Sequence, residues 1–209
     1  MFEKILLEKQ FLKTLPETFG TIKQKANTTR AYPSFNLYFE DESRFGLLTR
    51  QKKVLTKRGV KPLCPYQHSF DTTYLFGAFS PFNGNSYLLL LPYCNSTAFE
   101  LFLEEFSKQK PEEYKVLILD NGAFHRAKCL RIPPNIHLVF LPPYTPELNP
   151  AEKTWRTLKD AIAMKAYPTI EALINSLQTI IQTSLTPNTI KSICNNQFYK
   201  ATFQSIFNV

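Results

Sequence analysis

Three acidic side chains lie where predicted strands end or a predicted helix begins. Asp41 ends a segment of alternating apolar and polar residues, Asp120 ends a short apolar run, and Glu152 falls in the first turn of a predicted helix. Converging carboxylates repel one another, and their hard oxygen atoms suit Mg²⁺ or Mn²⁺. Two such ions, about 3.5 to 4 Å apart, can bind the attacking and the leaving oxygen of an in-line phosphoryl displacement. These three residues are our candidates for catalysis and metal binding, and the chemistry they predict is phosphodiester cleavage or strand transfer.

Each carboxylate also has a local explanation. Glu152 stands three residues after Asn149, where a capping-box glutamate bonds back to the helix cap. Asp120 precedes Asn121-Gly122 and can begin a turn. Asp41 is harder to explain locally, because a carboxylate on the apolar face of a strand is costly without a cation or hydrogen bonds.

The segment that ends at Asp41 has the strict alternation of a strand. One face carries Phe35, Leu37, Phe39 and Asp41. The other face carries Asn36, Tyr38 and Glu40. Glu40 and Glu42 therefore point away from Asp41, and we expect them to be solvated.

Periodicity and turn signals predict further strands and helices. The strands are expected at 73–80, 86–91, 116–119 and 136–141. The helices are expected from 97 to about 110, from 150 onward after a proline-rich loop, from 170 to 181, and from 187 onward. This order predicts an α/β fold, an RNase H-like mixed sheet flanked by helices. We expect an N-terminal arm, a catalytic domain and a C-terminal helical extension at 1–34, 35–167 and 168–209.

This fold would bring the three carboxylates together. Ligand crevices form outside the carboxyl ends of parallel strands, so Asp41 and Asp120 meet there if their strands are neighbours. Glu152 joins them if its helix packs across that edge, since it lies beside the apolar stripe of Trp155 and Leu158 on a helical wheel.

The charge balance points to a polyanionic partner. The chain carries 25 Lys and Arg against 17 Asp and Glu, a net charge of +8. One stretch without any acidic residue concentrates the positive charge, and its basic residues are Arg44, Arg50, Lys52, Lys53, Lys57, Arg58 and Lys61. Such a segment suits contacts with a DNA phosphate backbone, although a merely solvated basic loop is the alternative.

Other classes of protein are not supported. The sequence contains no P-loop, GxGxxG or GxSxG motif, which argues against nucleotide binding and acyl transfer. Its four cysteines are scattered without a CxxC pair, so neither a zinc site nor a disulfide framework is suggested, and we expect reduced thiols. No apolar run reaches the roughly 18 residues of a membrane helix, so no membrane partner is expected and the cytoplasm is the predicted location.

Four motifs, in order, resemble a known family. They are Phe39-Glu40-Asp41-Glu42-Ser43, Arg58-Gly59-Val60-Lys61-Pro62, the segment from Leu119-Asp120-Asn121-Gly122 to His125, and the proline-rich block from Leu141 to Asn149-Pro150-Ala151-Glu152 with Trp155. The sequence resembles the DDE catalytic domain of transposases of insertion-sequence family 630, in the mariner superfamily, over roughly residues 35 to 180.

The resemblance implies a mechanism and partners. Asp41, Asp120 and Glu152 would hold two Mg²⁺ or Mn²⁺ ions, while water cleaves a phosphodiester at the transposon end and the freed 3′-hydroxyl attacks target DNA. Asn121 and His125 would support the site, Asn121 by orienting Asp120 or a water; for His125 a surface or purely structural role is the alternative. Implied partners are the terminal inverted repeats, target DNA and a second copy of the chain, as expected for a prokaryotic protein that joins the nucleoid when bound to DNA.

One departure from the family pattern leaves alternatives open. Full-length relatives carry an N-terminal helix-turn-helix region that reads the inverted repeats, whereas 34 residues precede Phe35 here. An upstream helix-turn-helix chain is therefore a possible partner. The alternatives are a catalytically silent DNA-binding remnant and an RNase H-like nuclease that recognises nucleic-acid structure without joining strands.

Overall fold

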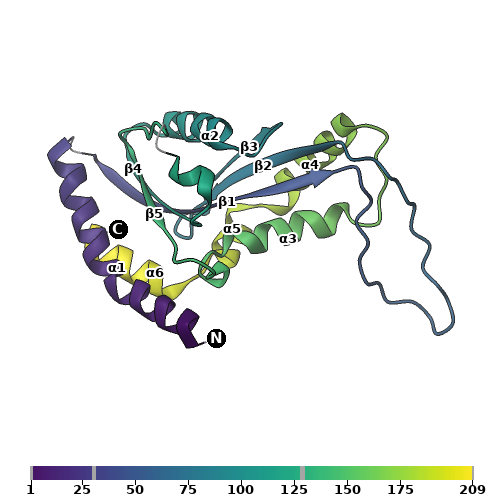
Figure 1. Ribbon diagram of the computed structural model, residues 1–209, viewed down its shortest axis with the longest axis horizontal. Helices are drawn as coiled ribbons and strands as arrows, with labels where there is room; N and C mark the ends of the chain where they lie inside the picture. Colours follow the sequence, from purple (N-terminus) through teal and green to yellow (C-terminus); the bar gives the residue numbers. More distant parts are fainter. Residues whose placement is uncertain (1, 30–31, 128–129, 209) are drawn as a thin grey trace.

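A five-stranded mixed sheet forms the centre of the molecule (Figure 1). The computed structural model describes residues 2–29, 32–127 and 130–208. The strands are β1 (Ser34–Gly46), β2 (Thr72–Phe79), β3 (Ser86–Leu91), β4 (Glu113–Leu119) and β5 (Ile136–Phe140). Their order in the sheet is β3-β2-β1-β4-β5, with β1, β2 and β3 antiparallel and β4 and β5 parallel to β1. The predicted RNase H-like mixed sheet is confirmed.

Helices cover both faces of this sheet. They are α1 (Phe2–Thr29), α2 (Ser96–Lys108), α3 (Ala151–Ile162), α4 (Ile170–Ser184), α5 (Pro187–Ile193) and α6 (Gln197–Phe207), with short 3₁₀ turns η1 (Ala123–Arg126) and η2 (Pro146–Leu148). Helix α2 packs on one face, and α3 with the C-terminal helices packs on the other. Helix α1 lies along α6, where the Phe19 and Phe203 rings meet edge to face at 5.3 Å (Figure 1). The division into arm, catalytic domain and extension stays a prediction.

The alternation along β1 places its residues as the sequence indicates. Leu37 and Phe39 are buried on the face covered by α3, and Tyr38 is buried on the face covered by α2. Strand β4 is buried along its whole length, as its continuous apolar run predicts. Strands β1 and β4 therefore form a rigid parallel pair at the centre of the sheet.

The expectation that Glu40 and Glu42 are solvated is wrong. Glu40 is 0% exposed and the side chain of Glu42 is 16% exposed. The reason is that α2 and η1 cover this face of β1, with the His125 ring of η1 packed 4.5 Å from Phe99 of α2. Alternation predicts the face on which a side chain lies, but not what covers that face.

A long excursion separates β1 from β2. Residues 47–71 form a long loop without regular secondary structure, and its outgoing and returning segments extend away from the sheet beyond the end of α3 (Figure 1). Its base is attached to the α3–α4 connection, because the Gln67 side chain donates to Tyr167 O at 2.8 Å and accepts from Tyr167 N at 3.0 Å. The tip turns through Gly59, whose φ of +84° favours glycine.

Two expectations about the chain concern cysteines and membranes. Cys64, Cys94 and Cys194 are free thiols, and Cys129 lies outside the described residues. Within the described ranges, no helix combines the length and the apolar character that crossing a membrane requires.

Candidate active site at the carboxyl edge of the sheet

The three predicted carboxylates converge on one cavity. Asp41 lies on β1 just beyond its pairing with β4, and Asp120 directly follows β4, so both emerge at the same edge of the sheet. Helix α3 packs against β1 and carries Glu152 in its first turn. All three residues line a cavity of about 400 Å³, together with Asn121 and the proline-rich loop after β5.

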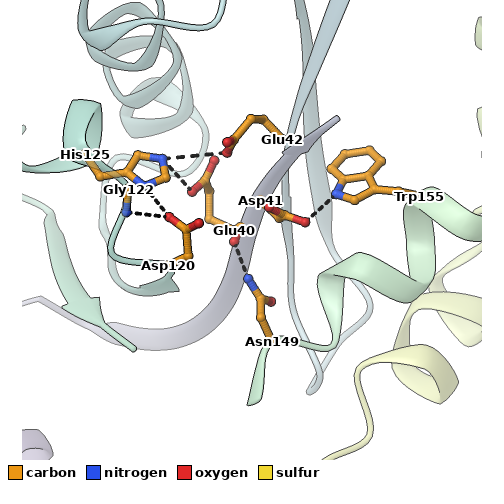
Figure 2. A network of polar contacts seen from close by, with 8 residues as sticks. All are labelled: Glu40, Asp41, Glu42, Asp120, Gly122, His125, Asn149 and Trp155. Atoms are coloured by element: carbon orange, nitrogen blue, oxygen red, sulfur yellow. Dashed lines mark hydrogen bonds and ion pairs between the residues drawn. The ribbon is translucent and has the colours of Figure 1, made fainter. Parts of the chain in front are cut away.

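Asp41 is held by an indole. Trp155 Nε1 donates a hydrogen bond of 2.8 Å to Asp41 Oδ2 (Figure 2). Burial raises the pKa of Asp41 to about 7, against the effect of this hydrogen bond, and the nearby carboxylates Glu152 and Asp120 raise the pKa further. Sequence reasoning placed Trp155 only in an apolar stripe. The available signal was that a buried tryptophan needs an acceptor for its N–H.

Asp120 is fixed by its own turn. Its Oδ1 atom accepts from Gly122 N at 2.8 Å and lies 2.8 Å from His125 Nδ1 (Figure 2). These contacts, led by the hydrogen bond from His125, lower the pKa of Asp120. The turn that was the local alternative is therefore present, and it is compatible with a place in the cavity wall.

His125 lies behind Asp120 and is buried. Its ring packs 4.1 Å from the ring of Phe124 and 4.5 Å from that of Phe99. Its second nitrogen, Nε2, lies 3.8 Å from Glu40 Oε2 and 3.7 Å from Glu42 Oε2. The exposed position that was the alternative for His125 is thus contradicted by its 2% exposure.

The start of α3 is joined to β1 by an asparagine. Asn149 Oδ1 accepts from Ala151 N at 3.1 Å, as a helix cap does, and Asn149 Nδ2 donates to Glu40 O at 2.7 Å (Figure 2). The Asn149 N–H, which a capping-box glutamate would bond, donates instead to Pro146 O at 2.9 Å. Glu152 lines the cavity, and its pKa is raised by burial and by the charges of Glu147 and Asp120.

The carboxylate oxygens that line this cavity are suitable ligands for a hard divalent cation. Asp41 uses Oδ2 and Asp120 uses Oδ1 for contacts within the protein. The cavity is lined by three carboxylates whose charges raise one another's pKa, as at Asp41 and Glu152. Oxygen ligands with uncompensated negative charge are those that Mg²⁺ and Mn²⁺ prefer.

The predicted DNA-binding residues do not line this cavity. All seven are exposed, with Arg44 on β1 and the remaining six on the 47–71 excursion. Lys52 Nζ donates to Asp160 O near the end of α3 at 3.0 Å, which places the start of the excursion beside that helix. The basic residues of the excursion therefore adjoin α3 at the end opposite Glu152 and do not form part of the cavity wall.

Comparisons with known proteins agree with this geometry. Residues 36–174 match the family model described as DDE superfamily endonuclease. An uncharacterized protein of Sinorhizobium fredii, y4pE/y4sA, is 42% identical over 88 residues, which are 42% of this chain and 65% of that protein.

Solved structures share the fold at low identity. A pre-cleavage Mos1 transpososome has a TM-score of 0.63 at 14% identity and covers 96% of this chain and 63% of its own. A Mos1 transposase paired-end complex with the left transposon end has a TM-score of 0.61 at 15% identity, and the match covers 92% of this chain and 61% of the Mos1 chain. This chain spans less than two thirds of the length of each of these three relatives. The family model, which includes Asp41, Asp120 and Glu152 and most of the sheet, shows that the chain belongs to the DDE superfamily endonucleases.

Proposed function

We propose that this chain is the catalytic domain of a transposase similar to those of insertion-sequence family 630, and that it cleaves DNA at transposon ends and joins it to target DNA. The observation that carries the proposal is the convergence of Asp41, Asp120 and Glu152 on one cavity at the carboxyl edge of the sheet. Membership of the DDE superfamily endonucleases supports phosphodiester cleavage. A Mos1 strand transfer complex, which shares the fold at 14% identity and a TM-score of 0.58, supports the joining step.

The three carboxylates would bind two Mg²⁺ or Mn²⁺ ions. Mos1 paired-end complexes are described with each of these metals. When bound, such ions activate the attacking oxygen and stabilise the leaving oxygen of the phosphodiester. The protein's own part is positioning: Trp155 orients Asp41, and Gly122 and His125 orient Asp120. Asn121 lines the same cavity, where we propose that it orients Asp120 or the attacking water.

DNA would lie along the basic surface. The seven exposed residues Arg44, Arg50, Lys52, Lys53, Lys57, Arg58 and Lys61 offer phosphate contacts, and the net charge of +8 favours association with any duplex. Such contacts position a duplex without reading its sequence. We therefore propose that recognition of the terminal inverted repeats depends on a helix-turn-helix region on another segment or chain, and that two copies act on paired ends.

Nicking of supercoiled plasmid tests the proposal. Purified protein is incubated with Mn²⁺ or Mg²⁺ at low and moderate salt, beside Asp41→Asn and Asp120→Asn. Glu104→Gln is the matched control, because Glu104 is an exposed carboxylate of α2 that does not line the cavity. We expect nicking by the wild type and the control, and none by the two site variants, with folding and DNA affinity retained.

Three results would contradict the proposal. Full nicking by Asp120→Asn would show that the cavity is not the active site. Salt-sensitive DNA binding by all proteins, with no metal-dependent cleavage by any of them even when a helix-turn-helix chain is added, would identify a DNA-binding remnant instead. Cutting of RNA hybrids or branched DNA without strand joining would identify a structure-selective nuclease.

A further inference from the structure

A second group of side chains of the types that bind metals lies close to Asp41 and Asp120. Among the described residues, Glu40, Glu42 and His125 each offer one ligand atom, and these atoms lie within 4.8 Å of one another. The side chains of Glu40 and His125 are 0% and 1% exposed. Within the described structure, both carboxylate oxygens of Glu40, Oε2 of Glu42 and Nε2 of His125 are buried without a hydrogen-bond partner. Buried polar atoms are normally paired, so this group needs an explanation.

The proton on His125 can be placed from its neighbours. Asp120 Oδ1 also accepts from Gly122 N at 2.8 Å, so it acts as an acceptor. His125 Nδ1, 2.8 Å away, is therefore the donor. In the neutral ring, Nε2 then presents a lone pair toward the carboxylates of Glu40 and Glu42 (Figure 2).

Hydrogen bonding does not satisfy this arrangement. The distances of 3.8 and 3.7 Å from Nε2 to the two glutamate oxygens are too long for hydrogen bonds, which end at about 3.2 Å. An imidazolium would bring one positive charge to a site that holds the carboxylates of Glu40, Glu42 and Asp120. Within the described structure, both carboxylate oxygens of Glu40 and Oε2 of Glu42 therefore stay buried without a hydrogen-bond partner, which is unfavourable without a cation.

A single divalent cation between the three side chains would account for the long separations and would balance the negative charge of the carboxylates. Bonds of about 2.0 to 2.2 Å from one ion to nitrogen and to oxygen, meeting at a wide angle, span the observed separations of 3.7 to 3.8 Å. Imidazole nitrogen beside carboxylate oxygen suits zinc and similar transition metals, whereas Mg²⁺ prefers an all-oxygen octahedral shell.

We propose that Glu40, Glu42 and His125 bind one zinc-like divalent ion, separate from the ions of the DDE carboxylates. The ion holds the imidazole of His125 in place, and His125 in turn holds Asp120. It is a structural ion that stiffens one wall of the active site, and it takes no part in the displacement at phosphorus. Its binding does not depend on the proposed transposase activity.

Zinc binding tests this inference in a protein whose catalytic carboxylates are disabled. The parent for the test is Asp41→Asn/Glu152→Gln, with any affinity tag removed. It is dialysed against micromolar zinc in the presence of millimolar magnesium, and the metal content is measured by elemental analysis. We expect one zinc per chain in this parent and none after the further changes Glu40→Gln and Glu42→Gln. The matched control replaces the exposed pair Glu104 and Glu105 with glutamine, and it retains its zinc.

Thermal unfolding provides a second measurement that does not depend on activity. Zinc raises the melting temperature of the parent because it binds the folded state. The melting temperature of the Glu40→Gln/Glu42→Gln protein does not respond to zinc, because both carboxylate ligands are gone. A parent that binds no zinc, or a glutamine variant that binds as much as the parent, would overturn the proposal.

Zinc-edge X-ray absorption of the parent identifies the ligands of the bound zinc, and this test does not require the glutamine variant to fold. The DDE carboxylates contain no nitrogen, so scattering from one imidazole among oxygen ligands is the signature of this site. Bound zinc without imidazole scattering, or with sulfur ligands, would show that the ion lies elsewhere.

Discussion

The 2.8 Å hydrogen bond from Trp155 Nε1 to Asp41 Oδ2 joins helix α3 to strand β1 at the active-site cavity. The same indole ring packs edge to face against Phe79 at 5.5 Å and Phe45 at 6.5 Å, so its orientation is set by the core. A rigid core contact thereby fixes the direction of a carboxylate that we propose as a metal ligand. Glu152, one turn earlier on the same helix, shares this support.

Trp155→Phe tests that link. The variant keeps an aromatic ring in the core and loses the donor to Asp41, so we expect a loss of roughly 1.5 to 3 kcal/mol in the free energy of unfolding, as for a hydrogen bond to a charged group. Urea denaturation measures this loss. In an Asp41→Ala background the same substitution should cost much less, because the acceptor is absent. Equal costs in the two backgrounds would show that the hydrogen bond contributes nothing to stability.

His125→Phe tests the support of Asp120. Phenylalanine fills the space between Phe99 and Phe124 and cannot donate to Asp120 Oδ1. We expect the concentration of Mn²⁺ needed for half-maximal nicking to rise by about 10- to 100-fold, the usual cost of removing a group that orients a metal ligand. His68→Phe, on the exposed excursion, serves as the control. An unchanged metal requirement would assign His125 to packing alone.

The basic excursion predicts a change in salt dependence. Replacing Lys57 and Arg58 with glutamine should lower the slope of log affinity against log salt by up to about 1.8, since each neutralised phosphate contributes roughly 0.9. Fluorescence anisotropy with a duplex of arbitrary sequence measures the slope. The double variant Lys9→Gln/Lys13→Gln removes the same charge from exposed positions of α1 and should leave the slope nearly unchanged. Equal effects of both pairs would indicate that only the net charge matters.

Buried Lys115 predicts how stability depends on pH. Lys115 is 0% exposed, and burial lowers its pKa to about 8. The pKa of a lysine in the unfolded chain is roughly 10.4, so between pH 8 and this value the unfolded chain binds more protons than the folded protein. The free energy of unfolding of the wild type, relative to that of Lys115→Met, therefore rises with pH across this window, by about 3 kcal/mol at most. Urea denaturation of both proteins at pH 8, 9 and 10 checks the trend. The prediction is contradicted if the difference in free energy of unfolding between wild type and Lys115→Met stays constant, or if it changes in favour of Lys115→Met as pH rises.

Much of the site could be predicted because its signals are local. Alternation places Asp41 on a face of β1, the continuous apolar run of β4 ends at Asp120, and the cap-then-proline pair Asn149-Pro150 starts the helix of Glu152. Each signal depends only on the strand or helix period and on the chemistry of turns and caps. The sequence left two conditions open, and the structure meets both: β1 and β4 are parallel neighbours, and α3 packs against β1.

The contacts that hold these carboxylates were decided by tertiary structure. Trp155 reaches Asp41 across 114 positions of sequence, and His125 is placed between Asp120 and the buried Glu40 only because α2 and η1 cover that face of β1. Helix α1 likewise buries Phe19 against Phe203 of α6, although its own sequence is polar and weakly periodic. Periodicity reports which side chains share a face, while burial depends on the distant segments that pack there. The sequence alone therefore determined which carboxylates end a strand or begin a helix. Strand pairing and helix packing determined that they meet at one edge of the sheet, which contacts hold them, and that Glu40 and Glu42 are buried.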